Sequence, residues 1–147
     1  MTVDGYDWSD ELAGLDFDEL SELYRIAPLG TKPPDALRTV FGNSMYRWFV
    51  RAGGALVGAG RAVADGRDVA YIADVAVHPE HQGRGLGRAV VRRLVEQAAG
   101  HKKILLYANP GTEPFYAGLG FLRMNTAMAI WHDPDSAVAN GILRREL

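Results

Sequence analysis

Residues 75–98, VAVHPEHQGRGLGRAVVRRLVEQA, join the end of a β-rich run to an amphipathic helical pattern through three glycines in five residues. Pro79 cannot donate to a sheet ladder, so the strand predicted over residues 69–77 ends before it. From Gly85 onward, apolar side chains recur at helical spacing with arginines on the opposite side, and Gly100 is the predicted end of this helix. The stretch therefore predicts a strand, a glycine loop and a helix in direct succession.

The glycine loop has the features of an anion site. A helix start leaves unpaired backbone N–H groups at the positive end of the helix dipole, and glycines let a phosphate group approach them. The residues predicted to bind a phosphate or pyrophosphate are Gln82, Gly83, Arg84, Gly85, Gly87 and Arg88. The alternative is a tight strand-to-helix turn with cationic surface residues, and the loop alone leaves both interpretations open.

Two common nucleotide motifs do not fit this loop. A P-loop requires Gly-Lys followed by Ser or Thr, whereas the chain has Gly87, Arg88 and Ala89 in succession. A dinucleotide fingerprint requires G-x-G-x-x-G, and Arg88 occupies the position of its last glycine when the motif is started at Gly83. Both nucleotide interpretations therefore fail on spacing.

The rest of the chain predicts a mixed sheet in a single domain over residues 1–147. Helices are expected over residues 18–27, 34–41 and 113–119, and strands over 46–51, 55–63, 69–77, 103–108 and 121–131. Helices come first, then an antiparallel meander, then strand, helix and strand. This order indicates an α/β (α+β) fold with helices on both faces of the sheet.

Two motifs at the proper separation resemble the GCN5-related N-acetyltransferase (GNAT) superfamily. One is Gln82 to Gly87, QGRGLG, which fits the family pattern Q/R-x-x-G-x-G/A and follows VAVHPE. The other is residues 107–121, YANPGTEPFYAGLGF, which fits N-(x)6-Y-x-x-x-G-F. The resemblance implies a sheet of about six to seven strands, a bulged strand before the loop, and loop amides that bind the pyrophosphate of acetyl-CoA.

The resemblance also implies roles in acyl transfer. Backbone N–H groups near Val75 and Val77 would pair with the pantetheine arm and face the thioester oxygen, and Asn109 would hold a pantetheine amide. Tyr116 would lie near the CoA sulfur, where a phenol can protonate the leaving thiolate at neutral pH. The alternatives are aromatic packing for Tyr116 beside Phe115 and a turn role for Asn109.

Asp74 is the candidate general base, because it lies within an otherwise apolar strand. A buried carboxylate is costly unless it is paired or binds its proton more tightly than usual, and tighter proton binding would suit proton abstraction. A structural Asp bonded to loop amides is equally compatible with the sequence, and the resemblance implies that the proton can pass through water instead. Base and structural role stay open at this point.

The acceptor is expected to be a primary amine of a small molecule. In related folds the early helices form the acceptor side of the cleft, so Tyr24 and Leu29 are candidate substrate contacts, with ordinary helix packing as the alternative. Residues 1–22 carry eight acidic side chains and no Lys or Arg, which would attract a cationic amine. Small amine, aminoglycoside-like, amino-acid and peptide acceptors, and acyl groups other than acetyl, all stay open.

Composition argues against several other functions and cofactors. The net charge of −2 offers no drive toward nucleic acid or a membrane, and the chain has no cysteine and four scattered histidines, so no metal is expected. The acidic N-terminus does not resemble a signal peptide, so a cytoplasmic location is expected, and a homodimer is possible. The competing interpretations are a non-catalytic CoA-binding regulator or self-resistance protein and a nucleic-acid-binding module that uses the arginine helix.

Overall fold

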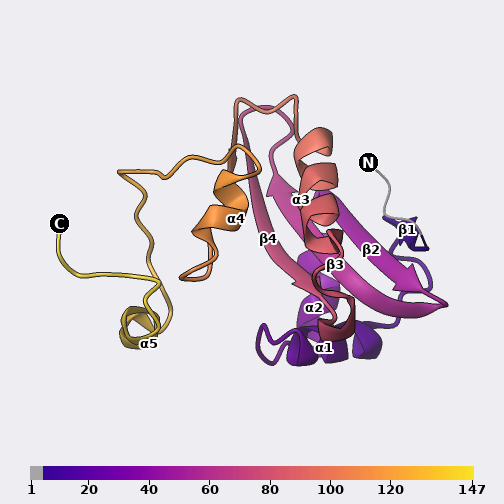
Figure 1. Ribbon diagram of the computed structural model, residues 1–147. Helices are drawn as coiled ribbons and strands as arrows, with labels where there is room; N and C mark the ends of the chain where they lie inside the picture. Colours follow the sequence, from indigo (N-terminus) through magenta and orange to yellow (C-terminus); the bar gives the residue numbers. More distant parts are fainter. Residues whose placement is uncertain (1–4) are drawn as a thin grey trace. The chain divides into compact units, whose positions relative to one another are not determined.

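The computed structural model describes residues 5–147; Asp4 of the acidic N-terminal stretch lies outside them. One sheet contains five strands in the order β1-β2-β3-β4-β5: β1 (Asp7–Ser9), β2 (Tyr46–Ala52), β3 (Ala55–Ala64), β4 (Val69–Val77) and β5 (Lys103–Leu105). Neighbours from β1 to β4 are antiparallel, while β5 is parallel to β4 (Figure 1). The mixed sheet is confirmed, although the described residues form five strands rather than six to seven.

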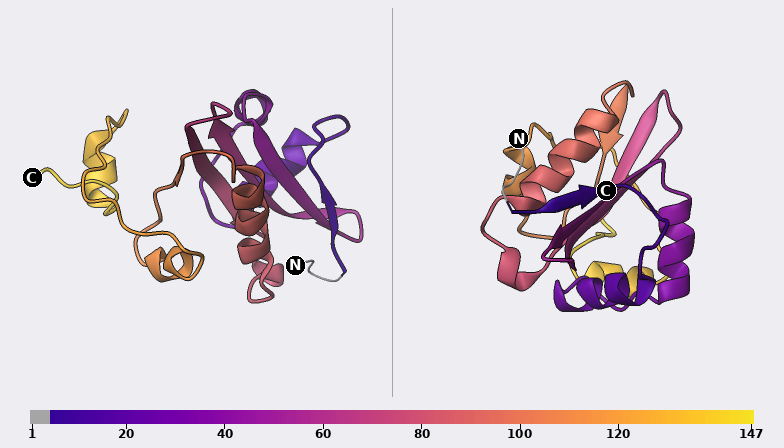
Figure 2. Two further views of the ribbon diagram at one scale, coloured as in Figure 1. Left: turned by 90° about the horizontal axis from the view of Figure 1, so that it is seen from above. Right: turned by 90° about the vertical axis from the view of Figure 1, so that its right-hand side faces the viewer.

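Three helices cover the two faces of this sheet. Helices α1 (Phe17–Ile26) and α2 (Pro34–Gly42) lie on one face and α3 (Leu86–Gln97) on the other (Figures 1 and 2). The Asp16 carboxylate caps α1 by accepting from the backbone N–H groups of the first turn. Helix α3 ends three residues before Gly100, with Ala98 as its C-cap. Helices on both faces are therefore confirmed, and the predicted end of α3 is corrected.

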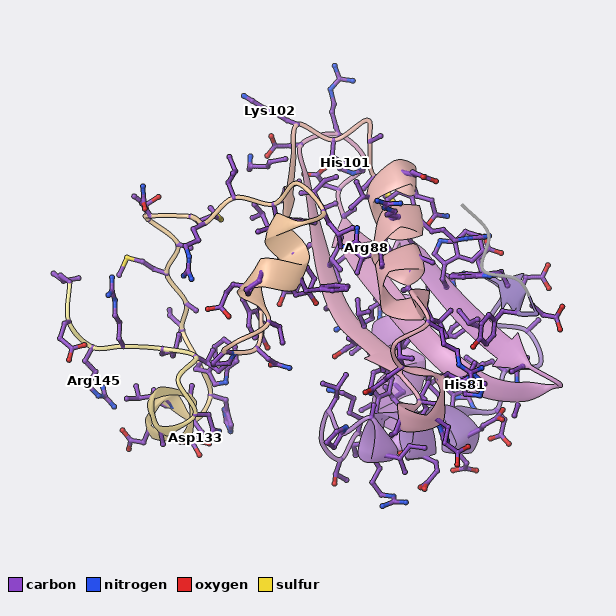
Figure 3. All side chains as sticks on the ribbon, viewed as in Figure 1. His81, Arg88, His101, Lys102, Asp133 and Arg145 are labelled. Carbon is purple, nitrogen blue, oxygen red and sulfur yellow. The ribbon has the colours of Figure 1, made fainter. Side chains whose placement is uncertain are left out.

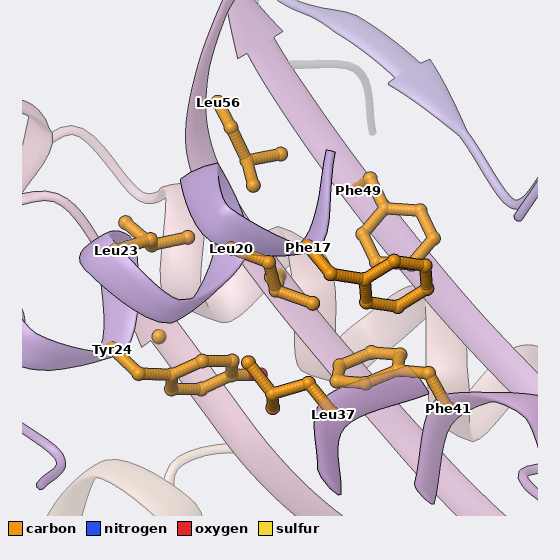
Figure 4. Packing of buried hydrophobic residues seen from close by; sticks show 10 residues of the cluster. Phe17, Leu20, Leu23, Tyr24, Leu37, Phe41, Phe49 and Leu56 are labelled. Atoms are coloured by element: carbon orange, nitrogen blue, oxygen red, sulfur yellow. The ribbon is translucent and has the colours of Figure 1, made fainter. Parts of the chain in front are cut away.

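The core on the α1 and α2 face is built from aromatic and leucine side chains. Tyr24 of α1, Phe41 of α2 and Phe49 of β2 are almost completely buried, and their rings follow one another with centroids 6.5 and 5.3 Å apart (Figure 4). Leu20, Leu23 and Leu37 fill the space around the rings. The amphipathic pattern of the two early helices is thus used for packing.

On the opposite face α3 packs closely onto β3. A Cβ atom built on Gly60 would lie 2.7 Å from Val90 Cγ1 and 3.3 Å from Leu94 Cδ1. Val90 and Leu94 both lie on the buried side of α3. The absence of a side chain at Gly60 therefore allows the helix to approach the sheet.

Substituting Gly60 should destabilise the fold through this contact. We expect Gly60→Ala to cost about 1–3 kcal/mol, because the stiff Val90 side chain has to move to admit the methyl group. Gly58→Ala is the matched control on the same strand, since its Cβ would meet neighbours at 3.4 Å, which is ordinary contact. Urea unfolding of the two variants measures the difference, and equal midpoints would contradict the close approach at Gly60.

Residues 107–147 form a second compact unit. It contains α4 (Glu113–Ala117), which begins next to Pro114 as expected, and α5 (Pro134–Ala139), which the sequence did not predict. The prediction of a strand over residues 121–131 is wrong, because this segment has no strand hydrogen bonding in the structure. Its alternating large side chains are exposed instead, among them Leu122, Met128 and Ile130. A β pattern produces a strand only where a partner strand is available.

Candidate functional site

Strand β4 carries a bulge immediately before the glycine loop. The register with β3 passes from Ala59 opposite Ala76 to Arg61 opposite Ala73, so β4 contains one more residue than β3 over this interval. Within residues 5–147, Asp74 is the one residue other than glycine with a positive φ, at 55°. The bulged strand that the resemblance implied is therefore confirmed, and its centre is Asp74.

The Asp74 carboxylate is paired with two cations. Arg61 Nε donates to Asp74 Oδ2 at 2.7 Å, and Lys32 Nζ lies 3.3 Å from Oδ1. The Asp74 side chain is 18% exposed and that of Arg61 15% exposed, so solvent screens the pair only partly. Arg61 also donates to the hydroxyl of Ser44, which is itself buried. The cost of placing a carboxylate in this strand is thus offset by ion pairing.

Tyr24 approaches the same bulge from α1. Its hydroxyl donates to the backbone carbonyl of Asp74 at 2.6 Å, and Lys32 Nζ lies 5.5 Å from its ring centroid. Burial raises the pKa of the Tyr24 phenol well above its ordinary value, with the Asp74 charge acting in the same direction, so the phenol stays protonated and continues to donate.

This placement corrects the role expected for Tyr24. Its side chain is 0% exposed, so it lies in the core and offers no surface to an acceptor. Leu29, the other candidate substrate contact, is half-buried at the edge of the core cluster, and its backbone N–H donates to the Tyr24 carbonyl. A substrate contact at Leu29 stays a prediction.

The glycine loop leads from the end of β4 into the first turn of α3. Gly83 and Gly85 both have positive φ values, 79° and 80°, and open space surrounds the positions of their missing Cβ atoms. Gly85 is the N-cap residue of α3 and provides no side chain to satisfy the first helical N–H groups. Gly87 lies in the first turn of the helix. The loop therefore presents bare backbone at a helix start, as a bound anion requires.

Two side chains close this loop against β4. Gln82 donates its side-chain amide to the carbonyl of Val77, the last residue of β4, at 3.1 Å. His78 caps the short 3₁₀ turn Pro79–His81 by accepting from the Glu80 N–H. The imidazole of His81 is hydrogen-bonded to the hydroxyl of Tyr6. Hydrogen bonds made by Gln82 and His78 therefore hold the first residues of the loop next to the end of β4.

Arginines in the glycine loop and on α3 have different surroundings. Arg84 and Arg88 are exposed next to the glycines, and neither forms an ion pair with a carboxylate within the described chain (Arg88 and His81 are labelled in Figure 3). Arg93 lies over the rings of Trp8 and Trp48, 4.0 and 4.8 Å from their centroids. Arg84 and Arg88 therefore supply uncompensated positive charge at the loop, whereas Arg93 ties α3 to β1 and β2.

Asn109 and Tyr116 belong to the unit of residues 107–147. The Asn109 carbonyl accepts from the backbone and hydroxyl of Thr112, and its side chain is exposed. Tyr116 is half-buried between Phe115 and Phe121 with edge-on ring contacts, and within its unit its hydroxyl forms no hydrogen bond. Partial burial raises the pKa of Tyr116 above its ordinary value. Both residues present free polar groups, and their predicted roles stay predictions.

The signal that could have identified the partners of Asp74 is present but weak. Arg61 interrupts an otherwise apolar strand run, and Lys32 is the one cation between the two early helical patterns. Neither position indicates by itself that the two side chains meet at one carboxylate.

Over the described residues 5–147, no three His, Cys, Asp or Glu side chains gather as a metal-binding group. Within the same range, the helices are too short or too polar to cross a membrane.

A bulged strand that runs into a left-handed glycine loop at a helix start is the arrangement that the resemblance to the GNAT superfamily implied. The family model described as "Acetyltransferase (GNAT) family" matches residues 14–121, a range that continues across both compact units. The chain belongs to the GNAT family of acetyltransferases, and family membership implies that it uses acetyl-CoA.

Relatives support this assignment. The chain is 37% identical over 114 residues to serotonin N-acetyltransferase 2, chloroplastic, of Oryza sativa, covering 74% of this chain and 57% of that protein. It is 42% identical over 65 residues to glucosamine 6-phosphate N-acetyltransferase 1 of the same plant, covering 43% and 39%. The chain thus spans about half the length, or less, of these curated relatives.

Among solved structures, a GNAT-family acetyltransferase from Streptococcus pneumoniae aligns with a TM-score of 0.73 and 20% identity. The alignment covers 87% of this chain and 96% of that chain. At this identity the likeness establishes the fold alone. It confirms the α/β GNAT fold predicted from the two motifs.

Proposed function

We propose that this protein transfers the acetyl group of acetyl-CoA to a primary amine of a small molecule. The observation that carries the proposal is the continuity of the β4 bulge with the loop of Gly83 and Gly85 at the start of α3. The bulge frees backbone from the β3 ladder, and the loop offers N–H groups and two exposed arginines to a pyrophosphate. The residues present therefore fit the group that the family implies.

The proposed reaction is a direct attack within a ternary complex. The neutral amine nitrogen attacks the thioester carbon, forming the C–N bond and an oxyanion that backbone N–H groups at Val75 and Val77 stabilise. The C–S bond then breaks, and the departing thiolate takes the phenolic proton of Tyr116, which solvent restores. The proton lost by the amine passes to a base. Asn109 would hold the pantetheine arm.

The identity of the base is the open step of this proposal. Asp74 is the candidate carboxylate, yet both of its oxygens face cations, Arg61 and Lys32. Such pairing supports the structural alternative over the base, because proton transfer to Asp74 would weaken two ion pairs. Water that carries the proton to solvent is the remaining route.

The pH profile of an Asp74→Asn variant separates these routes. If Asp74 takes the amine proton, its loss should make the rate depend more steeply on pH, because only the free amine and hydroxide then drive the reaction. Asparagine tolerates the positive φ at this position, so the bulge is retained. Acetyl transfer is measured from pH 6 to 9.5 at saturating acetyl-CoA. A parallel profile with a lower plateau would dismiss Asp74 as the base.

The proposed acceptor class rests on chemistry and on relatives. Two curated relatives are named for acetylation of serotonin and of glucosamine 6-phosphate, both of which are primary amines on small molecules. Asp10, Glu11 and Asp18, exposed side chains of the acidic N-terminal stretch, would favour the approach of a cation. We propose a small primary amine, and both arylalkylamines and amino sugars belong in the test.

The test is thiol release from acetyl-CoA in the presence of a panel of arylalkylamines, amino sugars, aminoglycosides, amino acids and short peptides. Amine-dependent release with one class supports the proposal and identifies the acceptor. Thermal stabilisation by CoA without release from any amine would favour a non-catalytic CoA-binding protein or a different acyl donor. The panel is repeated with longer acyl-CoA thioesters to separate those two outcomes.

A further inference from the structure

In the bulge of β4, one backbone peptide group is hydrogen-bonded to a side chain from another element. This peptide joins Asp74 to Val75, and the two residues lie within the interval where β3 and β4 lose register. Its carbonyl oxygen accepts the 2.6 Å hydrogen bond from the buried hydroxyl of Tyr24. Its nitrogen is the backbone N–H of Val75, the proposed donor to the thioester oxygen.

The planar peptide bond links the direction of the Asp74 carbonyl to the direction of the Val75 N–H. No cis peptide bond occurs among the described residues, so the carbonyl of Asp74 and the N–H of Val75 point in opposite directions. Fixing the carbonyl toward α1 therefore fixes the N–H away from it. Hydrogen bonding at the carbonyl also polarises the peptide and strengthens its N–H as a donor.

Other contacts hold the side chain of Asp74, next to this peptide. The Asp74 carboxylate is held by Arg61 from β3 and by Lys32 from the loop between α1 and α2. That loop is itself tied to α1, because the Ser21 hydroxyl donates to the Lys32 carbonyl at 2.6 Å. Asp74 adopts a left-handed φ that is unfavourable for most side chains, and these contacts offset the cost.

We infer that Tyr24 is a positioning residue for acyl transfer, which orients and polarises the Asp74–Val75 peptide as a donor to the thioester oxygen. Tyr24 acts from the core and touches neither substrate. The inference rests on the proposed function, since it gives the Val75 N–H a role only if an acyl-CoA is bound there. It assigns to Tyr24 a role that neither its burial nor its helix predicts.

Tyr24→Phe tests the inference, because it removes one hydroxyl and keeps the ring in the core. We expect kcat for amine acetylation to fall about 10-fold, less than the loss of an oxyanion donor itself, because the N–H remains but is less well aimed and polarised. The Kd for CoA, which lacks the acyl carbonyl, should change less than 2-fold. The infrared carbonyl band of bound acetyl-CoA should move toward its position for free acetyl-CoA.

Tyr46→Phe is the matched control. Tyr46 begins β2, and within the described residues its hydroxyl has no hydrogen bond, so the variant should retain the kcat and the carbonyl band of the wild type. Wild-type kcat and an unshifted band in Tyr24→Phe would overturn the inference. So would a lower kcat with a proportionate loss of CoA affinity and an unshifted band, which a purely structural role produces.

The two proposals can fail separately. If the wild type binds acetyl-CoA but acetylates no amine, the proposed function fails, and the infrared band of the bound thioester still decides whether Tyr24 controls the carbonyl contact. If the wild type turns over and Tyr24→Phe behaves like Tyr46→Phe, the inference fails and the proposed function stands. If the wild type does not bind acetyl-CoA, both are overturned.

Discussion

Tyr116→Phe should lower kcat for amine acetylation by about 100-fold or more, because it deletes the one group proposed to protonate the departing thiolate. Phenylalanine keeps the ring, so the edge-on contacts with Phe115 and Phe121 remain and the unit of residues 107–147 should stay folded. Affinity for CoA should be retained within about 3-fold, since the loop that binds its pyrophosphate is unchanged. The measurement is steady-state thiol release at saturating amine and acetyl-CoA.

The pH dependence of the two forms provides a second test of Tyr116. Partial burial raises the pKa of its phenol above the ordinary value near 10, so the phenol keeps its proton at neutral pH. Activity should therefore show no alkaline loss from Tyr116 between pH 6 and 9. The rise of activity with pH reflects deprotonation of the amine and should be common to both forms. The variant should lower the plateau without moving this rise.

Two outcomes would contradict the acid role. Equal kcat values for wild type and Tyr116→Phe would show that the aromatic packing already present is the whole function of the side chain. A fall between pH 7 and 8 that is the same in wild type and in Tyr116→Phe would assign the acid to another group. Either result would leave protonation of the thiolate to a group other than Tyr116.

The features predicted correctly from the sequence are those that depend on neighbouring residues. The helical periodicity of residues 86–98 and the β-rich, apolar run of residues 69–77 predicted α3 and β4, because helix and strand patterns are local. The start of α4 next to Pro114 follows from the same kind of information. Helices on both faces followed from the order of these elements.

Features that depend on distant partners were missed or misplaced. Arg61 and Lys32 meet at Asp74 only because β3 and the α1–α2 loop come together in space, and nothing in their sequence neighbourhoods predicts that meeting. Strand β1 has three residues and is recognisable only through its pairing with β2. The segment of residues 121–131 shows the reverse error, in which a strand pattern has no partner.

Tyr24 illustrates why a family position did not determine a residue's role. The resemblance put it on the acceptor side, while its helical face predicted burial, and the structure favours the second. Its hydroxyl nevertheless reaches the backbone of the candidate site, through a contact 50 residues away in the sequence. A residue can therefore belong to the core and still influence the chemistry.

Replacing Gly85 by Asp should abolish most of the affinity for CoA, because it places a carboxylate where the pyrophosphate is proposed to bind. Gly85 has a φ of 80°, and Asp and Asn are the residues other than glycine that best tolerate this region. Nothing lies within 4 Å of the new Cβ position, and the backbone strain of a side chain at this φ is common to both variants. Gly85→Asn is therefore the matched control, with the same shape and no charge.

We expect the Kd for CoA to rise about 10-fold in Gly85→Asn and at least about 100-fold further in Gly85→Asp. Two like charges about 4 Å apart repel by about 4 kcal/mol at the effective dielectric of a protein surface, and part of this is screened. The difference between the variants should shrink as salt is raised. Isothermal titration with CoA at two salt concentrations measures both effects.

The stability of these variants should change in the opposite sense to their affinity. An acidic side chain at the start of α3 interacts favourably with the helix dipole, so Gly85→Asp should be at least as stable as Gly85→Asn without ligand. If the loop were only a strand-to-helix turn, the two variants would bind CoA equally. A more stable protein with a much weaker affinity would instead show that the helix start, left bare by Gly85, is where the phosphates are held.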